Sequence, residues 1–575
     1  MSMYTRRTLP AGLALGPAVA ILLVAARPAG AAAAFGVQNV DGGQTAPGGG
    51  PAPGAEPWRS ALYPTNWTPG FSDAQGRFLH DFSFAGYHRG EVPVPTRAGP
   101  LVDVTQAPYL VDKTGIADVT PQIQRALDDA GSRGGGVVYL PAGTYRVRPQ
   151  DVNSFALHLR YSNVVLRGAG RDQTLVFNDA TDMRGKKVLY VAPRSTPLTW
   201  HSGEVGATRI ETDLPAPTTV LPVASVEGFA PGDWVVVKAD ATDAWIAEHG
   251  MTGKWTTAAL RGVALWRRVV AVARVARALI IDTPTRYPLL RRDGARVYKT
   301  AAPLQEVGVE QLAIGMRENL TPGTAEEHYD TPGTGAYQMH DSYALYLNHV
   351  VDGWIKNVSS FRPKPNVSDV HLLSNGVRLE YAARVTVDGT NLAKPQYKGG
   401  GGNGYHFSLG GNDCLLTNCK ATAGRHNYSF RGLQTSGNVV LRSAFRDGAL
   451  PADFHMFLSM ANLIDNATVD GDTLQAVYRP HGTVVHGQTT TQSVFWNTNG
   501  LRYPAKRPPY AVISRQFGWG YVIGTRGPCS AVSVPIERPT EQPDYKEGEG
   551  HGDTLVPASL YEDQLRRRRR PGTSS

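Results

Sequence analysis

Short runs of alternating or wholly apolar residues recur through the second half of this 575-residue chain. From residue 307 they return about every 20 to 30 residues, for example at 376–387, 405–419, 427–441 and 454–469. Each run holds a strand, a turn and a second strand, and Asn or Gly stands at many of the turns, where a left-handed backbone is tolerated. A steady period of this length is typical of stacked repeat units. The pattern therefore predicts a solenoid of β-strands.

The segment 115–147, GIADVTPQIQRALDDAGSRGGGVVYLPAGTYRV, is predicted to open this solenoid. Ile123, Leu127 and Ala130 recur at helical spacing, which predicts a short amphipathic helix. The glycines after it let the chain turn into the apolar run VVYL, the first buried strand. An uncovered first coil would offer unpaired backbone groups to other chains, so a capping helix is expected at this end.

This order of acidic turn, helix, glycine run and strand closed by PAGTY resembles the pectate-lyase superfamily. The aromatic stretch DFSFAGY at 81–87 is similar to the leader of bacterial β-helix polysaccharide lyases and hydrolases. The resemblance implies an all-β fold: a right-handed parallel β-helix with an N-terminal cap helix. A βαβ unit with a Gly-rich loop is the alternative, but no phosphate-loop or GxGxxG motif follows a strand here.

The composition changes several times along the chain and predicts seven segments. Arg6 and Arg7 precede an apolar run and small residues, which is typical of an export signal and resembles a twin-arginine signal. A membrane anchor is the alternative, but Gly12, Gly16 and Pro17 interrupt the run. We therefore expect a secreted, extracellular or periplasmic protein without stable membrane insertion. The predicted segments are the signal at 1–34, a Gly/Pro-rich linker at 35–57, a leader at 58–112, the cap helix and first coils at 113–195, an inserted β unit at 196–297, the main β-helix at 298–530 and a tail at 531–575.

The alternative for 196–297 is a few irregular coils that carry long loops. The net charge of +9 favours an acidic polymer as partner. No helix-turn-helix, RNA-binding aromatic strand or zinc spacing is present, so nucleic acid is not the expected partner. Cys414, Cys419 and Cys529 are too few for a disulfide framework and do not have metal-ligand spacing.

Strict alternation along the strands predicts a column of polar side chains on one outer face. In the run at 405–409, inward Tyr405 and Phe407 leave His406 outward. His406, Asn427 and His455 are 21 and 28 positions apart, which is one coil each, so stacking at about 4.8 Å would align them. The outward set predicted in this way is His406, Arg425, Asn427, Arg431, Asp453, His455 and His486.

Hydrolysis of a polysaccharide in this place requires two carboxylates about 5 to 9.5 Å apart. Glu380 and Asp453 are predicted three coils apart, about 14 Å, which is too far. A turn that brings Asp369, Asp413 or Asp465 beside Asp453 would restore a hydrolytic pair.

β-Elimination from a uronic acid requires a group that neutralises the substrate carboxylate, a base for the C5 proton and an acid for the leaving oxygen. We expect Arg425, Asn427 and His406 to polarise the carboxylate, and His455 to act as the base with Asp453 orienting it. The predicted catalytic residues are His455, Arg425, His406 and Asp453, and the predicted substrate-binding residues are Asn427, Arg431, His486, Lys394 and Lys398.

Lys394 and Lys398, in a Gly-rich loop, are the alternative bases. No acidic triad supports the Ca²⁺ that many β-helix lyases use, so no metal or other cofactor is predicted. The predicted function is cleavage of an acidic, uronic-acid-containing polysaccharide, by β-elimination. A glycoside hydrolase on the same fold and a non-catalytic glycan-binding β-helix are the alternatives. A monomer and a homotrimer both remain open.

Overall fold

The computed structural model describes residues 56–96, 101–150, 154–194, 200–201, 204–528, 531–536 and 542–570. The predicted export signal at 1–34, the linker as far as residue 55 and Cys529 lie outside these ranges. The chain divides into two units, Met1–Gly49 and Gly50–Ser575, and the structure below is that of the second. Within the described ranges, no helix has both the length and the apolar character needed to cross a membrane.

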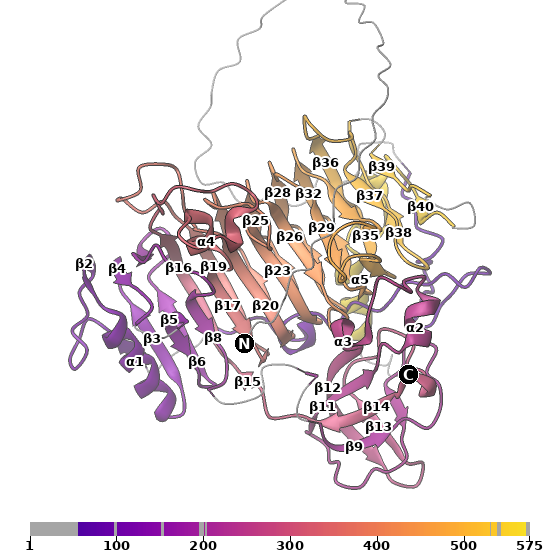
Figure 1. Ribbon diagram of the computed structural model, residues 1–575. Coiled ribbons are helices and arrows are strands. Elements are labelled where there is room, and N and C mark those ends of the chain that lie inside the picture. Colours follow the sequence, from indigo (N-terminus) through magenta and orange to yellow (C-terminus); the bar gives the residue numbers. More distant parts are fainter. Residues whose placement is uncertain are drawn as a thin grey trace, which may run out of the picture. The chain divides into compact units, whose positions relative to one another are not determined.

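The architecture is a parallel β-helix, as the sequence predicts (Figure 1). Each full coil adds one strand to a 12-stranded sheet, here called the site sheet. Its members are β5 (Phe155–Leu159), β8 (Lys187–Val191), β17 (Tyr343–Asn348), β20 (Asn375–Ala383), β23 (Tyr405–Asn412), β26 (His426–Arg431), β29 (Ala452–Met456), β33 (Leu474–Ala476), β37 (Val512–Ser514) and β39 (Val532–Ser533), joined at β20 by β18 (Val350–Val351) and β15 (Leu304–Gln305).

The other two faces of the coils form one 20-stranded sheet, because the long strands β16 (Gly308–Met316) and β19 (Trp354–Ser360) pair in both faces. One face also contains β1 (Leu101–Asp103), β3 (Gly136–Leu140), β6 (Val164–Gly168), β21 (Thr386–Asp388), β24 (Leu415–Thr417), β27 (Val439–Leu441), β31 (Leu463–Asp465), β35 (Val494–Trp496), β38 (Tyr521–Ile523) and β40 (Tyr545–Glu547). The other contains β2 (Thr114–Asp118), β4 (Gly143–Val147), β7 (Thr174–Asn178), β22 (Asn391–Ala393), β25 (Lys420–Thr422), β28 (Ala444–Arg446), β32 (Thr468–Asp470) and β36 (Asn499–Arg502). A separate pair consists of β30 (Ser459–Met460) and β34 (Thr490–Thr491).

The core of the coils is a continuous set of inward apolar side chains. Phe407, Phe430 and Phe454 on consecutive strands of the site sheet are at most 1% exposed. The rings of Phe430 and Phe454 are stacked with centroids 4.8 Å apart. Aromatic stacking of this kind adds packing energy to the parallel ladder and holds neighbouring coils in register.

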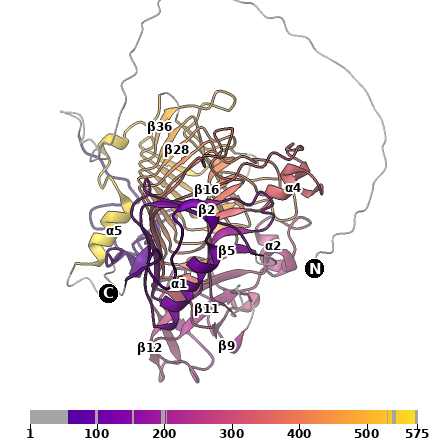
Figure 2. The same ribbon diagram turned by 90° about the vertical axis from the view of Figure 1, so that its left-hand side faces the viewer.

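The predicted cap helix is present as α1 (Thr120–Ser132) and lies at the first coils (Figure 2). The predicted stripe of Ile123, Leu127 and Ala130 is buried against the first strands. Gln124 Nε2 donates a hydrogen bond to the backbone oxygen of His158 at 3.0 Å. The helix therefore covers the apolar end of the stack, and the cap-helix prediction is confirmed.

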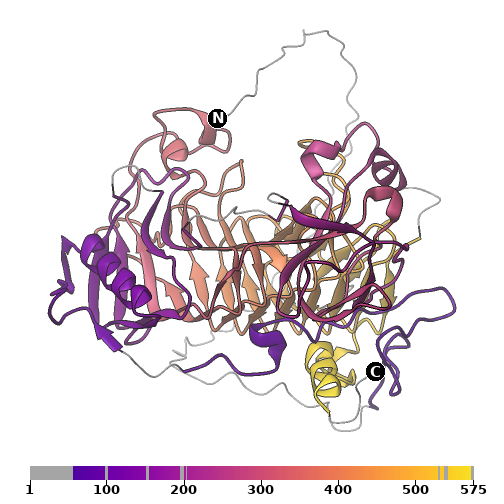
Figure 3. The same ribbon diagram turned by 90° about the horizontal axis from the view of Figure 1, so that it is seen from below.

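An antiparallel sheet of six strands, here called the inserted sheet, follows β8 in the chain (Figures 1 and 3). It consists of β9 (Val205–Arg209), β10 (Val220–Pro222), β11 (Trp234–Ala239), β12 (Val263–Ala273), β13 (Ala278–Ile281) and β14 (Arg296–Lys299). Its core continues into Leu433, Leu458 and Met460 of the coils. The fold class, including a small inserted β unit, is therefore confirmed, whereas the predicted segment boundaries stay predictions.

The remaining helices in the described ranges are short. They are α2 (Asp243–Glu248), α3 (Thr257–Leu260), α4 (Gly335–Met339) and α5 (Leu560–Arg568), with 3-10 turns at Tyr87–Gly90, Arg291–Asp293, His328–Asp330 and Gly552–Thr554. Leader and tail pack together, since Tyr63 Oη donates a hydrogen bond to Asp563 at 2.8 Å and Tyr561 Oη donates one to the backbone oxygen of Ala85 at 2.8 Å. Both also pack on the first face of the coils around Trp496.

Candidate functional site

The strands β23 and β26 do not keep strict alternation at their first residues. Tyr405 pairs with His426 and Phe407 pairs with Tyr428, and both Phe407 and Tyr428 belong to the core. His406 also lies inside: its side chain is 0% exposed and its Nε2 is 3.0 Å from the backbone oxygen of Thr422. Two successive side chains thus point inward, and Tyr405 and His426 project from the other side of the sheet, where neighbouring side chains leave them only 3% and 1% exposed.

The prediction that His406 and Asn427 face outward is therefore wrong. Asn427 is 0% exposed, and its Nδ2 donates hydrogen bonds to Asp472 Oδ2 at 2.7 Å and to the backbone oxygen of Arg446 at 3.0 Å. The cause is the tight corner before each strand, where Gly404 has φ 75° and Ala423 has φ 61°. The corner shifts the phase of the alternation by one residue, so neither side chain meets a polymer bound outside.

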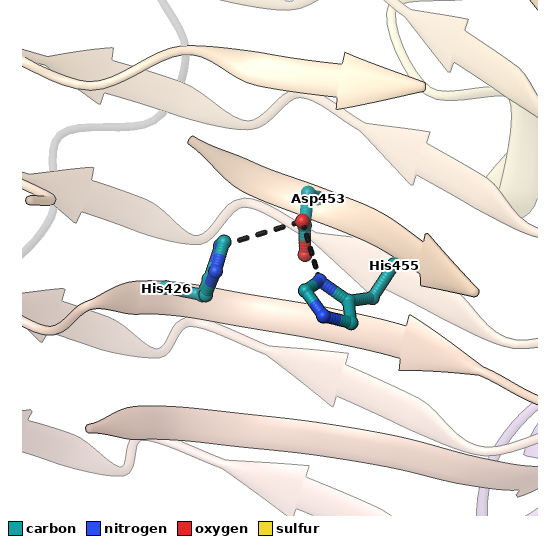
Figure 4. Close-up of side chains that lie close together, drawn as sticks. All are labelled: His426, Asp453 and His455. Carbon is teal, nitrogen blue, oxygen red and sulfur yellow. Dashed lines mark hydrogen bonds and ion pairs between the residues drawn. The ribbon is translucent and has the colours of Figure 1, made fainter. Parts of the chain in front are cut away.

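The outward side chains converge on Asp453 (Figure 4). Its Oδ2 atom lies 2.9 Å from His455 Nδ1 and 3.4 Å from His426 Nδ1, and it accepts a hydrogen bond from the Arg479 guanidinium. The second ring nitrogen of His455, Nε2, lies 3.3 Å from Tyr405 Oη. We call Tyr405, His426, Asp453, His455 and Arg479 the Asp453 cluster.

Asp453 and His455 lie on the same side of β29, and a bulge interrupts the ladder at His455. Ser429 pairs with Asp453 and Phe430 with Phe454, but the next pair is Arg431 with Met456. The extra residue is His455, which is left out of the ladder. Without the bulge, the side chain of Arg431 would face the position of His455; with it, His455 turns back over Asp453.

Charge and burial fix the protonation of the cluster. Burial alone would raise the pKa of Asp453, but the neighbouring His426, His455 and Arg479 outweigh it and lower that pKa well below its usual range. Burial raises the pKa of Tyr405, and the charge of Asp453 adds to this effect, so the phenol keeps its proton at neutral pH. Burial lowers the pKa of His426 to about 3, which leaves its ring neutral.

The Asp453 carboxylate accepts hydrogen bonds, so the Nδ1 of His455 carries a proton towards it. The other nitrogen, Nε2, then presents a lone pair at the Tyr405 hydroxyl. The arrangement can accept a proton at His455 and deliver one from Tyr405. It is an acid–base pair, with Asp453 orienting the ring.

Ligand atoms of His426, Asp453 and His455 all lie within 4.8 Å of one another, which is compatible with a bound metal ion. Arg479 already donates to the Asp453 oxygen that such an ion would use. A guanidinium in that place repels a cation, so the arrangement fits proton transfer better than metal binding. That no metal is used stays a prediction.

The predicted catalytic residue Arg425 and most of the predicted binding residues lie around the cluster. The ring of His486 lies 5.3 Å from that of His455, and burial lowers its pKa to about 4. Arg431 extends from the end of β26, and within the described part of the chain it forms no ion pair. Arg425, at the corner before β26, pairs with Glu326 and donates to the backbone oxygen of Lys398, so it forms a rim of the site. Lys398 Nζ lies 3.4 Å from the backbone oxygen of Ala423.

Lys394 lies apart from the cluster. It follows β22 of the 20-stranded sheet and forms an ion pair with Asp369 at 3.3 Å. The Asp453 cluster lies on the site sheet, around a corner of the coil. The structure therefore does not bring Lys394 to the predicted site.

The carboxylates that would permit hydrolysis do not join Asp453. Asp413 is buried between Arg267 and Arg286, and Asp465 accepts hydrogen bonds from Ser559 Oγ and Tyr561 N. Asp369 is the partner of Lys394, and Glu380 on β20 is three strands from Asp453. Asp453 itself is 0% exposed, so its oxygens do not reach a substrate as a nucleophile must.

The segment between α2 and α3, which packs on the inserted sheet, holds the loop that carries Arg479 and His486. Trp255 Nε1 donates a hydrogen bond to the backbone oxygen of His486 at 2.8 Å, and Lys254 Nζ donates one to the backbone oxygen of Pro480 at 2.8 Å. Gly487 has φ 134°, and a Cβ there would lie 2.3 Å from Met251 Cε. The loop therefore fits closely against the segment between α2 and α3.

Sequence reasoning missed three members of the cluster. Alternation placed Tyr405 inward, and His426 was not among the predicted residues; only the Gly404 and Ala423 corners signal the change of phase. Arg479 is 26 residues after Asp453, about one coil along the chain, but it stands in a loop without a strand pattern. Its position depends on the inserted sheet, which no local pattern reveals.

Residues 108–205 match the family model described as "Rhamnogalacturonase A/epimerase, pectate lyase-like". Over 62 residues, 11% of this chain, the sequence is 45% identical to Mannuronan C5-epimerase AlgE5 and to Alginate lyase 7, both of Azotobacter vinelandii. The matched segments are 6% and 7% of those two proteins, so the chain spans only a small part of the curated relatives it resembles.

Solved structures with a similar backbone include two phage proteins. One is the tailspike protein of E. coli bacteriophage HK620 in complex with a pentasaccharide, with 10% identity, a TM-score of 0.40, and coverage of 74% of this chain and 57% of that chain. The other is the tailspike protein gp49 from Pseudomonas phage LKA1, with 12% identity, a TM-score of 0.36, and coverage of 78% and 81%.

Proposed function

We propose that this pectate-lyase-like protein removes the C5 proton of a uronic-acid unit in an acidic polysaccharide and cleaves the chain by β-elimination. One observation carries the proposal: Tyr405 Oη and His455 Nε2 lie 3.3 Å apart on the outer side of the site sheet, with Asp453 fixing the ring of His455. An acid and a base this close can serve both proton transfers of an elimination.

The first step is proton abstraction. A positive charge beside the substrate carboxylate stabilises the enolate that forms when the C5–H bond breaks, and Arg431, whose charge acts on Tyr405, is the cation placed for this. His455 Nε2 takes the proton, and the ionised Asp453 stabilises the resulting imidazolium.

The second step is loss of the leaving group. The electron pair left at C5 forms the C4=C5 double bond as the C4–O bond breaks, and Tyr405 gives its proton to the departing oxygen. The tyrosinate then takes back the proton held by His455 across the 3.3 Å contact. The pair returns to its starting state, and no co-reactant is consumed.

C5 epimerisation is the second candidate, favoured by the 45% identity to Mannuronan C5-epimerase AlgE5 over 62 residues. It shares the first step, but C5 then receives a proton on the opposite face and the glycosidic bond remains. A hydrolase is disfavoured because Asp453 is buried and held by Arg479. A non-catalytic glycan-binding β-helix would give no product with any polymer. We further propose that the substrate is met outside the cytoplasm, which rests on the signal pattern at 1–34.

The test uses alginate and polygalacturonate as substrates for the purified protein. β-Elimination produces the absorbance of unsaturated uronates together with new reducing ends, hydrolysis produces reducing ends alone, and epimerisation produces neither but changes the uronate composition. His455→Ala is expected to lower the rate by about 10²-fold or more. His551→Ala, an exposed histidine in the tail, is the control and is expected to leave the rate unchanged. Reducing ends without unsaturation would overturn the proposal.

A further inference from the structure

We propose that a row of aromatic and basic side chains on the first strands of the site sheet binds additional units of the same acidic polysaccharide. This inference rests on the proposed function and assigns it an extended binding site. The row, here called the tyrosine row, consists of Phe155, Lys187, Tyr190, Tyr343, Tyr346 and Arg378.

The rings of the tyrosine row occupy consecutive strands. Tyr190 on β8 pairs with Tyr346 on β17, and their ring centroids lie 5.8 Å apart at an angle of 78°. Phe155 on β5 stacks on Tyr190, with centroids 5.8 Å apart. Phe155, Tyr190 and Tyr346 are all partly exposed. A folded protein places an apolar ring in the core or against a neighbour, so a row of partly exposed rings on one sheet provides a surface for a ligand.

Basic groups lie directly on these rings. Lys187 Nζ is 5.5 Å from the ring centroid of Tyr346 and 5.9 Å from that of Tyr190. It donates to the backbone oxygen of Gly185, and within the described ranges it has no carboxylate partner. The Arg378 guanidinium lies 5.3 Å from the Tyr346 centroid, but it is paired with Glu380. Lys187 is therefore the cation of the row that is free to meet a substrate carboxylate.

The tyrosine row and the Asp453 cluster belong to one column. Ladder pairs connect Tyr346 to Arg378, Arg378 to Ser408, Ser408 to Ser429 and Ser429 to Asp453. The strand of Tyr190 is three strands from that of Tyr405, about 14 Å at the usual spacing. A linear polymer lying across the strands (Figure 1) thus meets the rings before it reaches the acid–base pair.

Ser408 and Ser429 lie between the row and the cluster but are at most 3% exposed, so the rings of the row and the partly exposed His455 supply the contact surface of the column. Tyrosine rings offer an apolar face to the C–H groups of a sugar and a hydroxyl to its polar edge. Lys187 adds a charge-assisted hydrogen bond to a uronate carboxylate. This combination selects a uronic-acid polymer over a neutral one.

Binding is measured by isothermal titration with the His455→Ala protein, which keeps the polymer intact. The ligands are alginate and polygalacturonate, and dextran is the neutral control. Lys187→Gln and Tyr346→Ala are each expected to weaken binding of an acidic polymer at least about tenfold, by loss of a charged hydrogen bond or a stacked ring. Lys186→Gln is the matched control, because Lys186 Nζ donates to the backbone oxygen of Asp182 and lies outside the row.

A second test uses the protein with His455 intact, because a purely structural role of Lys187 would not give the expected kinetic result. Lys187→Gln should raise KM for long chains at unchanged kcat, and leave KM for the shortest cleavable oligomer unchanged, because that oligomer covers the cluster alone. Equal affinity of the variants and the His455→Ala parent for both acidic polymers, or equal binding of dextran, would overturn the inference. Binding of the acidic polymers without any activity would support the tyrosine row as a binding site but overturn the proposed function.

Discussion

His455 Nδ1 lies 2.9 Å from Asp453 Oδ2. Residues two positions apart in a regular strand share a face, but their side chains project side by side and not toward each other. The contact exists because His455 is the bulged residue of β29. The bulge turns the ring back over the carboxylate, and the same turn directs Nε2 to Tyr405. A backbone irregularity in one strand thereby creates the acid–base pair.

Asp453→Asn should reduce kcat strongly, by about 10² to 10⁴-fold, because the amide supplies no negative charge to stabilise the imidazolium of His455 and no longer fixes its tautomer. Steady-state rates on the polymer that proves to be the substrate measure this. Asp470→Asn is the control, since Asp470 pairs with Arg446 and Arg502 on another face of the coils. Thermal melting must show that Asp453→Asn is folded; a folded variant with wild-type kcat would exclude Asp453 from the reaction.

Tyr405→Phe removes one hydroxyl and keeps the ring. If Tyr405 donates the proton to the leaving oxygen, kcat should fall about 10²-fold or more while the affinity for the polymer changes little. The melting temperature should stay close to that of the wild type, because the hydroxyl contacts His455 alone among the hydrogen-bond partners described for it. A rise in KM at constant kcat would assign Tyr405 to binding.

Trp255→Phe tests whether the inserted sheet positions the reaction machinery. The change removes the hydrogen bond to the backbone oxygen of His486, so the loop that carries Arg479 should loosen and kcat/KM should fall by about three- to tenfold, the effect of a bond worth roughly 1 kcal/mol. Amide exchange in residues 477–488 should accelerate.

Trp266→Phe is the matched control for Trp255→Phe. Trp266, on β12 of the inserted sheet, is buried like Trp255, but its indole N–H has no hydrogen-bond partner in the described structure. Both variants lose the same atoms, and only one loses a hydrogen bond. Equal effects of the two changes on kcat/KM and on exchange would mean that the hydrogen bond to His486 has no positioning role.

Asp465→Asn tests how the tail is held. Burial raises the pKa of Asp465 to about 7 in the folded protein, against an ordinary value of 3.8. The unfolded chain therefore releases this proton first, and the wild type loses stability as the pH rises from about 4 to about 7, with no further loss above that. The variant lacks this loss.

Chemical denaturation at several pH values measures the difference. The free energy of unfolding of Asp465→Asn relative to wild type should increase between pH 4 and 7 and then level off, by at most about 4 kcal/mol. An Asn side chain can still accept the hydrogen bonds from Ser559 and Tyr561. A difference that stays constant over this pH range would show that Asp465 is ionised in the folded protein.

The fold could be predicted from the sequence because its signals are local. The helical spacing of Ile123 and Leu127 and the repeated inward aromatics, such as Phe407 and Phe430, report burial directly. The same alternation correctly placed Asp453 with His455 on the outer side. It failed for His406 and Asn427, because a corner in the backbone precedes each of their strands and shifts the phase.

The rest of the site depends on contacts between distant segments. Arg479 reaches Asp453 from a loop that Lys254 and Trp255 hold, more than 200 positions earlier in the chain. No periodic pattern encodes such a contact. The tyrosine row was also hidden, since Tyr190 and Tyr346 are separated by the whole inserted sheet and become neighbours only when β8 pairs with β17.

The most direct measurement is the nuclear magnetic resonance spectrum of a polyuronate after reaction in D₂O. Abstraction of the C5 proton by His455 predicts chain ends with a C4=C5 double bond, and it predicts that His455→Ala leaves the polymer unchanged. Deuterium at C5 of intact units would retain the abstraction step and assign the product to epimerisation. New reducing ends in which every unit keeps its C5 proton and no double bond forms would contradict the account.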